Sequence, residues 1–148
     1  MRPIKVALLA ITVVIGVVGS AAAESVTVQG SGDIKKMVAI NGQTAAVTKV
    51  FGLGKPCASA QYVSIHVMWG TSEYDVEGAC SMQGSWDTGL FYQQDRSNPN
   101  AKEVNCPGFT LTYNSTNKSL KAFIPRSCMT KAPNRVKFKS EGATFSAA

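Results

Sequence analysis

One stretch of seventeen residues, SIHVMWGTSEYDVEGAC from Ser64 to Cys80, holds side chains of the types that hydrolases use. Ser64 precedes the chain's only histidine, His66, by two positions. Three carboxylates follow at alternate positions: Glu73, Asp75 and Glu77. A serine, a histidine and a carboxylate can act as nucleophile, base and orienting acid, and two carboxylates can hydrolyse a glycosidic bond.

The pattern around this stretch predicts a hairpin, which explains the clustering without catalysis. Gly70-Thr71 suits a two-residue type II′ loop, because that loop needs glycine at its first position. The loop puts His66 opposite Asp75 and turns Ser64 to the same outer face. Cα atoms two residues apart on a strand lie roughly 6.5–7 Å apart, so we expect the short Ser64 side chain not to reach His66. The sequence therefore predicts a polar sheet face of cross-strand His–carboxylate pairs, not an active site.

The three carboxylates are also candidates for binding a cation. Side chains on one strand face point the same way, so they cannot flank a sugar from opposite sides as a glycosidase requires. Calcium accepts several oxygen ligands of loose geometry. Glu73, Asp75 and Glu77 are therefore candidate metal ligands, and we expect no other cofactor.

Two aromatic residues are the best candidates for binding a ligand. Trp86 has Gly84 and Thr88 two positions away, so it lacks apolar neighbours and could be exposed, with Tyr92 further along the same strand. Exposed aromatic rings on a secreted sandwich indicate stacking on sugar rings or on a partner protein. The alternative is that Trp86 belongs to the core.

The N-terminus predicts export. Two basic residues precede an apolar, uncharged run from Val6 to Gly19, and Ala21-Ala-Ala23 ends the segment with small residues. These features are typical of a signal peptide cleaved after Ala23, and the run is shorter than the roughly 20 residues that span a bilayer. The expected organisation is a signal peptide at 1–23 and a single domain at 24–148, without a membrane span in the mature form.

The charge of the mature chain is modest. Removing Arg2 and Lys5 leaves 13 basic residues against 9 acidic ones, a net charge of +4. Most of the surplus follows Lys118 and alternates with apolar residues, as on a solvated strand face. Nucleic acid is therefore not an expected partner.

Four cysteines in a short exported chain predict two disulfides. No C-x₂₋₄-C pair exists, which argues against a zinc site and against redox catalysis. The hairpin through Gly70-Thr71 brings Cys80 toward Cys57, and a second hairpin that pairs Leu111 with Ala122 brings Cys106 toward Cys128. The predicted bridges are Cys57–Cys80 and Cys106–Cys128.

The mature chain shows no amphipathic helical pattern and reads as a series of short strands separated by Gly, Pro, Asn and Ser. The expected strands are 25–29, 34–41, 43–51, 61–69, 72–79, 85–93, 102–106, 109–113, 119–124 and 134–140. Asn41-Gly42 predicts a two-residue type I′ turn, and Pro125 to Met129 predicts a short turn or one helical turn. The fold class is an all-β antiparallel sandwich of the jelly-roll or immunoglobulin-like kind.

Several stretches resemble small secreted actinobacterial proteins of the kind similar to family 9 carbohydrate-binding modules and DOMON-like domains. The most specific is Ile124-Pro-Arg-Ser-Cys128 followed by the strand Pro133-Asn-Arg-Val-Lys-Phe138. The others are Gly32-Asp-Ile34, Asn41-Gly42, Tyr62-Val-Ser-Ile-His-Val67, Val104-Asn-Cys106 and Tyr113-Asn114. The resemblance implies a β-sandwich without enzymatic activity and, in sugar-binding members, a cleft with paired tryptophans and bound calcium. Trp69 reads as core and no acidic loop matches, so neither feature is transferred.

The sequence thus predicts a secreted, extracellular, monomeric module that binds and does not catalyse. The expected ligand is a carbohydrate or cell-envelope polymer, with Trp86 and Tyr92 as contacts. An extracellular protein-interaction module, such as an inhibitor or adhesin, is the alternative, and a small hydrolase comes third.

Overall fold

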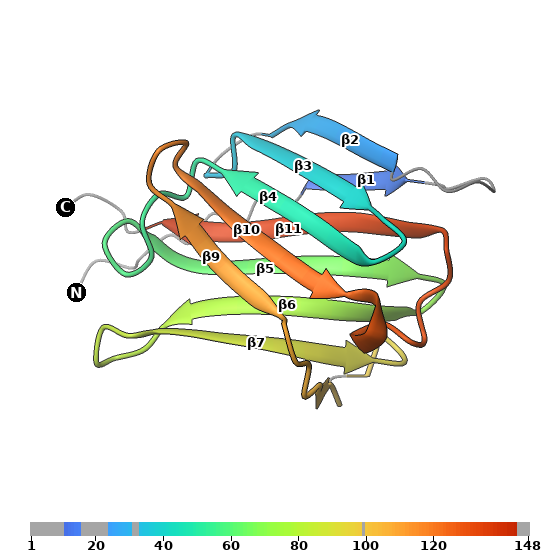
Figure 1. Cartoon of the computed structure of the whole chain (residues 1–148). Helices are drawn as coiled ribbons and strands as arrows, with labels where there is room; N and C mark the ends of the chain where they lie inside the picture. The colour runs from blue at the N-terminus through green and yellow to red at the C-terminus, as the bar shows by residue number, and fades with distance from the viewer. Residues whose placement is uncertain (1–10, 16–23, 31–32, 99, 145–148) are drawn as a thin grey trace.

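The computed structural model describes residues 11–15, 24–30, 33–98 and 100–144. These form two antiparallel sheets that pack face to face (Figure 1). Sheet A runs in the order β1 (Ile11–Ile15), β11 (Val136–Thr144), β5 (Ala60–Trp69), β6 (Ser72–Cys80), β7 (Trp86–Gln93), β8 (Lys102–Glu103). Sheet B runs in the order β2 (Glu24–Gln29), β3 (Lys36–Asn41), β4 (Ala45–Phe51), β10 (Ser119–Pro125), β9 (Thr110–Asn114). The expected antiparallel β-sandwich is confirmed.

The core lies between the sheets because each strand alternates apolar and polar residues. On β5, Val63, Ile65 and Val67 have no exposed surface, and they face Leu120 and Ile124 of the other sheet across one continuous cluster. A strand of period two that buries one face must present the other outward. The outer face of sheet A therefore carries polar and charged side chains of β5 and β6, and the outer face of sheet B carries Lys49 and Lys121 together with apolar side chains such as Val47 and Phe123.

Both predicted hairpin registers are confirmed. In β5–β6, Trp69 pairs with Ser72 and His66 with Asp75, and Gly70 has the positive φ that its turn requires. In β9–β10, Leu111 pairs with Ala122. The disulfides follow from these registers: Cys57–Cys80 and Cys106–Cys128.

The two-residue turn predicted at Asn41-Gly42 is wrong. Asn41 pairs with Ala46, so the connection is longer, and neither turn residue has a positive φ. Long-range hydrogen bonds hold Asn41 in its strand: its side-chain N–H donates to Asn134 O at 2.7 Å, and its side-chain oxygen accepts from Arg126. Arg126 also donates to Gly42 O at 2.8 Å. These contacts outweigh the local preference of an Asn-Gly pair.

Other segments agree with the sequence in position and differ in extent. The expected strand 102–106 is only two residues long, and its pairing with β7 ends one residue later, where Val104 N–H donates to Leu90 O at 2.8 Å. A 3₁₀ turn, η1 (Arg126–Cys128), follows Pro125 as predicted. Among the described residues, no helix is long and apolar enough to cross a membrane.

β1 falls within the predicted signal peptide. Its residues pair with β11, from Ile11 opposite Ser140 to Ile15 opposite Val136. The proposed cleavage site after Ala23 follows residues 16–23, which lie outside the described part of the chain. Cleavage and the domain boundary at 24 stay predictions.

Candidate functional site

The residues of catalytic type meet on the outer face of sheet A. Ser64 Oγ lies 2.9 Å from Nε2 of His66 and donates a hydrogen bond to Oδ1 of Asp75 at 2.5 Å. On the other side of the ring, Nδ1 of His66 lies 3.2 Å from Oε2 of Glu73 and 3.6 Å from Oδ1 of Asp75. Serine, histidine and glutamate therefore stand in the order of a hydrolase relay.

The expectation that Ser64 does not reach His66 is wrong. The Cα spacing along β5 is as large as a strand requires, but the imidazole is long enough to lean back over the shorter serine. The hydroxyl in turn reaches across to Asp75 on the neighbouring strand, where the register places that carboxylate beside it.

The contacts in this cluster favour a protonated His66, which is not the form that a general base needs. A serine hydroxyl has one hydrogen, and Ser64 gives it to Asp75. The contact with Nε2 is therefore satisfied when His66 donates, and the carboxylate beside Nδ1 favours a proton there as well. A doubly protonated imidazolium has no lone pair with which to activate a nucleophile.

Burial and neighbouring charge oppose each other at His66 and at Asp75, and the net shift raises the pKa of both groups. Burial lowers the pKa of His66, but Glu73, Asp75 and Glu141 overcome that effect and raise it. Burial is the main cause that raises the pKa of Asp75 to about 6, against the attraction of His66. Burial also raises the pKa of the neighbouring Tyr62 to about 12.

The cluster is also closed to substrate. Ser64 has no exposed surface and Glu73 keeps only 6%. From β11, Lys139 stands opposite His66 and Glu141 opposite Ser64, and these two form an ion pair. The hydroxyl of Ser64 is satisfied within the cluster, whereas Nδ1 of His66 lies buried beside Glu73 at ion-pair distance and has no hydrogen-bond partner among the described residues. We interpret the cluster as part of the architecture.

Two of the three carboxylates predicted as metal ligands make other contacts. Glu73 faces the imidazole of His66, Asp75 holds the hydroxyl of Ser64, and Glu77 is half-buried further along β6. Among the described residues, no group of three or more His, Cys, Asp or Glu side chains is placed to hold a metal ion.

Trp86 and Tyr92 both lie on the inner side of β7, where neither is a fully exposed platform. Trp86 is half-buried, and its ring covers Gly78 so closely that a Cβ there would lie 2.5 Å from a ring atom. Tyr92 packs against Trp69 and Tyr74, with ring centroids 6.3 and 5.2 Å away. The packing supports the core interpretation of Trp86, and a binding role for either residue stays a prediction.

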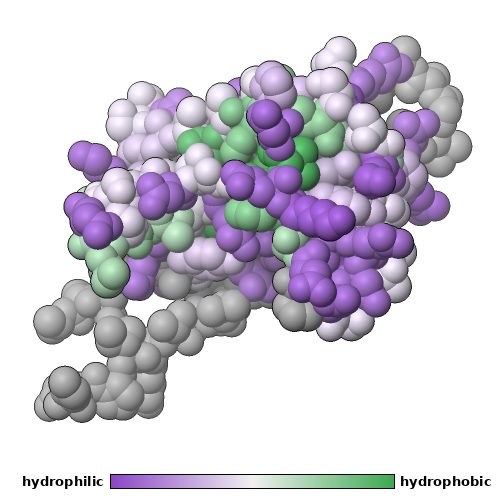
Figure 2. Space-filling model, turned by 90° about the horizontal axis from the view of Figure 1, so that it is seen from below, coloured by the Kyte–Doolittle hydropathy of each residue, from purple (hydrophilic) through white to green (hydrophobic). Residues whose placement is uncertain are grey.

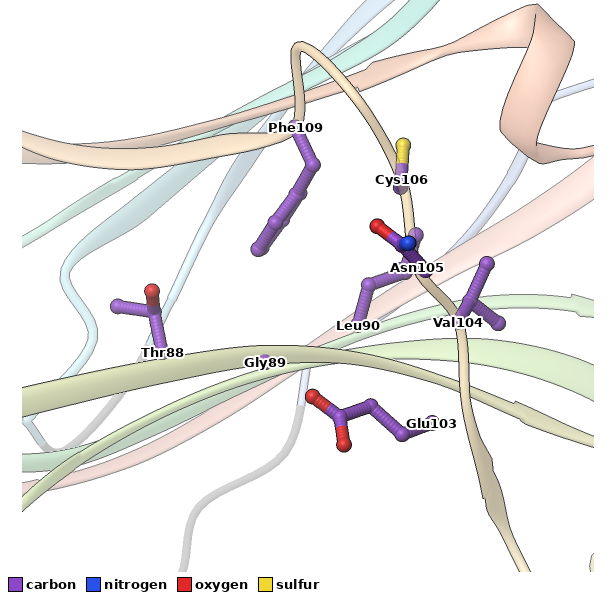
Figure 3. A pocket seen from close by; sticks show the side chains of 8 residues that line it. All are labelled: Thr88, Gly89, Leu90, Glu103, Val104, Asn105, Cys106 and Phe109. Atoms are coloured by element: carbon purple, nitrogen blue, oxygen red, sulfur yellow. The ribbon is translucent and has the colours of Figure 1, made fainter.

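A first recess opens between β7 and the segment that leads to β9, and we call it the Phe109 recess. Its volume is about 360 Å³, and its lining includes Thr88, Leu90, Asn105 and Phe109. Figure 3 shows the Phe109 ring extending toward Thr88, with the Asn105 carboxamide beside the same space. In Figure 2, hydrophobic residues gather in the middle of this side of the molecule and hydrophilic residues surround them.

A second recess, the Tyr92 recess, lies at the C-terminal end of β7 and has a volume of about 420 Å³. Its lining is one aromatic ring with amide and charged side chains: Tyr92, Gln93, Gln94, Asp95, Asn98, Asn100, Lys102 and Lys131. Lys131 Nζ lies 5.4 Å from the centroid of the Tyr92 ring, within the range of a cation–π contact.

Arg96 fixes the loop that forms one wall of the Tyr92 recess. Its guanidinium donates to Gly70 O at 2.7 Å and to Ser72 O at 3.0 Å, at the turn between β5 and β6. Asp95 accepts bonds from the N–H and the hydroxyl of Ser97 at 2.9 and 2.7 Å. The loop is thereby tied to a rigid hairpin.

Sequence reasoning missed most of this lining. Asp95 to Asn100 reads as a turn, and nothing in its composition shows that Arg96 reaches the hairpin at Gly70. Phe109 reads as the start of an apolar strand, so its position at the edge of the core was not expected. Only Tyr92 was identified, from its aromatic ring.

No protein-family model matches this chain, and no curated protein or solved structure matches it significantly. The resemblance to family 9 carbohydrate-binding modules and DOMON-like domains therefore stays a prediction.

Proposed function

We propose that this protein is a secreted, non-catalytic binding module for a carbohydrate or cell-envelope polymer, with its binding surface along β7. One observation carries the proposal. Two recesses of about 360 and 420 Å³ lie along the same strand, and each combines an aromatic ring with at least one carboxamide side chain. Sugars offer apolar ring faces and many hydroxyls, which match aromatic rings and amides respectively.

The dimensions support a ligand of sugar size. Both volumes fall in the range of about 300–1,000 Å³ that is typical of small-molecule sites. β8 separates the recesses, because Lys102 pairs with Tyr92 and Glu103 with Phe91. An extended polymer that follows β7 would meet one aromatic ring on each side of this short strand.

The wall of the Tyr92 recess is preorganised, which favours binding. Ordering a loop when a ligand arrives costs free energy, so a loop held beforehand binds more tightly. The Arg96 contacts with Gly70 and Ser72 hold this one. Secretion remains part of the proposal, and the two disulfides support it because such bonds persist in oxidising compartments.

The test is retention of the purified mature protein on insoluble cellulose, chitin and bacterial cell-wall preparations, with and without calcium. We expect the wild type to be retained on at least one of them and Tyr92→Ala to lose retention. The double variant Gln94→Ala/Asn100→Ala should weaken it without disturbing the core, because both side chains are exposed. Met82→Ala is the control, since Met82 is fully exposed and lies in neither recess.

Two outcomes would contradict the proposal. One is no retention on any polymer, together with capture of a single extracellular protein, which would favour the alternative interaction module. The other is retention that the recess variants leave equal to that of Met82→Ala. Trp86 was the first contact predicted from the sequence, and it lines neither recess. Retention of Trp86→Ala therefore tells whether Trp86 contributes to binding separately from the residues of the two recesses.

A further inference from the structure

A third recess lies on the opposite side of the sandwich, on the outer face of sheet B, which faces the reader in Figure 1. Its volume is about 550 Å³, and it is bounded by β4, β9, β10 and the turn between β9 and β10. Its lining includes two lysines and four uncharged polar residues: Lys49, Lys121, Thr112, Asn114, Asn117 and Ser119. This recess is independent of the two along β7.

Two lysines are placed directly opposite each other at this recess. Lys121 on β10 is the cross-strand partner of Lys49 on β4. Their neighbours Val50 and Leu120 are buried in the core, so both lysines must point outward. Like charges at directly opposed positions repel each other and destabilise a sheet. Among the described residues, neither ammonium group forms an ion pair with a carboxylate.

The turn adds hydrogen-bond donors. The side-chain oxygen of Asn114 already accepts the N–H groups of Thr116 and Asn117, at 2.9 and 3.3 Å. The side-chain oxygen of Asn117 accepts the hydroxyl of Ser119 at 2.6 Å. Each carboxamide has its oxygen occupied and its NH₂ group left to donate.

We propose that this recess binds a divalent oxyanion, such as a phosphate group. Two ammonium groups face a space that is also bordered by carboxamide NH₂ groups and the hydroxyl of Thr112. A phosphate carries close to two negative charges at neutral pH and offers only acceptors apart from any remaining proton. Its binding between Lys49 and Lys121 would turn their repulsion into a shared attraction.

The phosphate could be a free ion or part of an anionic polymer, and the experiment separates these sources. Isothermal titration calorimetry at low ionic strength would use inorganic phosphate in one arm and polyphosphate in the other. Tighter binding of polyphosphate per phosphate group would identify a polymer. Equal binding per group would identify the free ion. Either result requires that wild type binds.

The variants test whether this recess is the site. Lys49→Gln and Lys121→Gln should each weaken phosphate binding by about tenfold or more, the effect of losing one charge-assisted hydrogen bond. Lys137→Gln removes the same charge from an exposed position on sheet A and should leave binding unchanged. No measurable binding by wild type, or an equal loss in Lys137→Gln, would overturn the proposal. Tyr92→Ala should still bind phosphate, so this result does not depend on the β7 recesses.

Discussion

The two outer faces of the sandwich use charge in opposite ways. On sheet A, His66 is held between Ser64, Asp75 and Glu73, and Lys139 pairs with Glu141 beside it. On sheet B, Lys49 and Lys121 oppose each other and have no carboxylate partner in the described chain. On sheet A each charge of the cluster has an opposite charge beside it, although Nδ1 of His66 has no hydrogen-bond partner, whereas on sheet B the two lysines face each other without a carboxylate. The proposed oxyanion site therefore rests on unpaired charge and not on catalytic residue types.

Removing His66 should produce the largest change. In His66→Ala, Glu73 and Asp75 would be left as buried carboxylates without a cation, and breaking such a pair costs about 3 kcal/mol. Urea unfolding at pH 7 measures the loss of free energy of unfolding. Lys137→Ala, an exposed change on the same face, should stay within about 0.5 kcal/mol of wild type. A cost for His66→Ala no greater than that of the control would show that the cluster does not stabilise the fold.

The pH dependence of stability should also reflect the sheet A cluster. On folding, the pKa of Asp75 rises from 3.8 to about 6, and the pKa of His66 rises above its ordinary value of 6.5. Both groups bind protons more tightly in the folded state, so stability falls as pH increases through this range. The contribution of Asp75 is lost between about pH 4 and 6, and that of His66 above 6.5. The Asp75 shift alone should lower the free energy of unfolding by about 2 kcal/mol between pH 4 and 8, and the His66 shift should lower it further.

Asp75→Asn is the matched variant for this profile. It keeps an oxygen that can accept the Ser64 hydroxyl but does not titrate. The melting temperature of this variant should therefore depend less on pH between 4 and 6 than that of wild type. A wild-type protein that becomes more stable as pH rises through this window would contradict the account.

The smallest change in the free energy of unfolding is expected for a substitution on sheet B. Lys121→Gln removes one of two opposed charges and no ion pair, so the free energy of unfolding should stay the same or rise by up to about 0.5 kcal/mol. Urea unfolding in a phosphate-free buffer measures it. A loss above 1 kcal/mol would mean that Lys121 has a structural partner.

Alternation along the chain was enough to predict the strands, because an apolar residue on one face of β5 or β6 fixes where its neighbours point. Glycine at position 70 then set the hairpin register, and the register set the Cys57–Cys80 bridge. The failures involve long side chains that cross between distant segments. Arg126 overrides the turn at Asn41, Arg96 ties a loop to Gly70, and the His66 ring reaches Ser64. No local pattern encodes these contacts, and the recesses depend on them.

The contrast between the two faces depends most directly on the protonation of His66. The chain has one histidine, so an NMR pH titration of its imidazole signals needs no assignment, provided that the purification tag contains none. We predict a pKa above 6.5 in wild type and a lower value in Glu73→Gln, which removes the charge beside Nδ1. A wild-type pKa below 6.5 that Glu73→Gln leaves unchanged would contradict the account, because it would free His66 to act as a base.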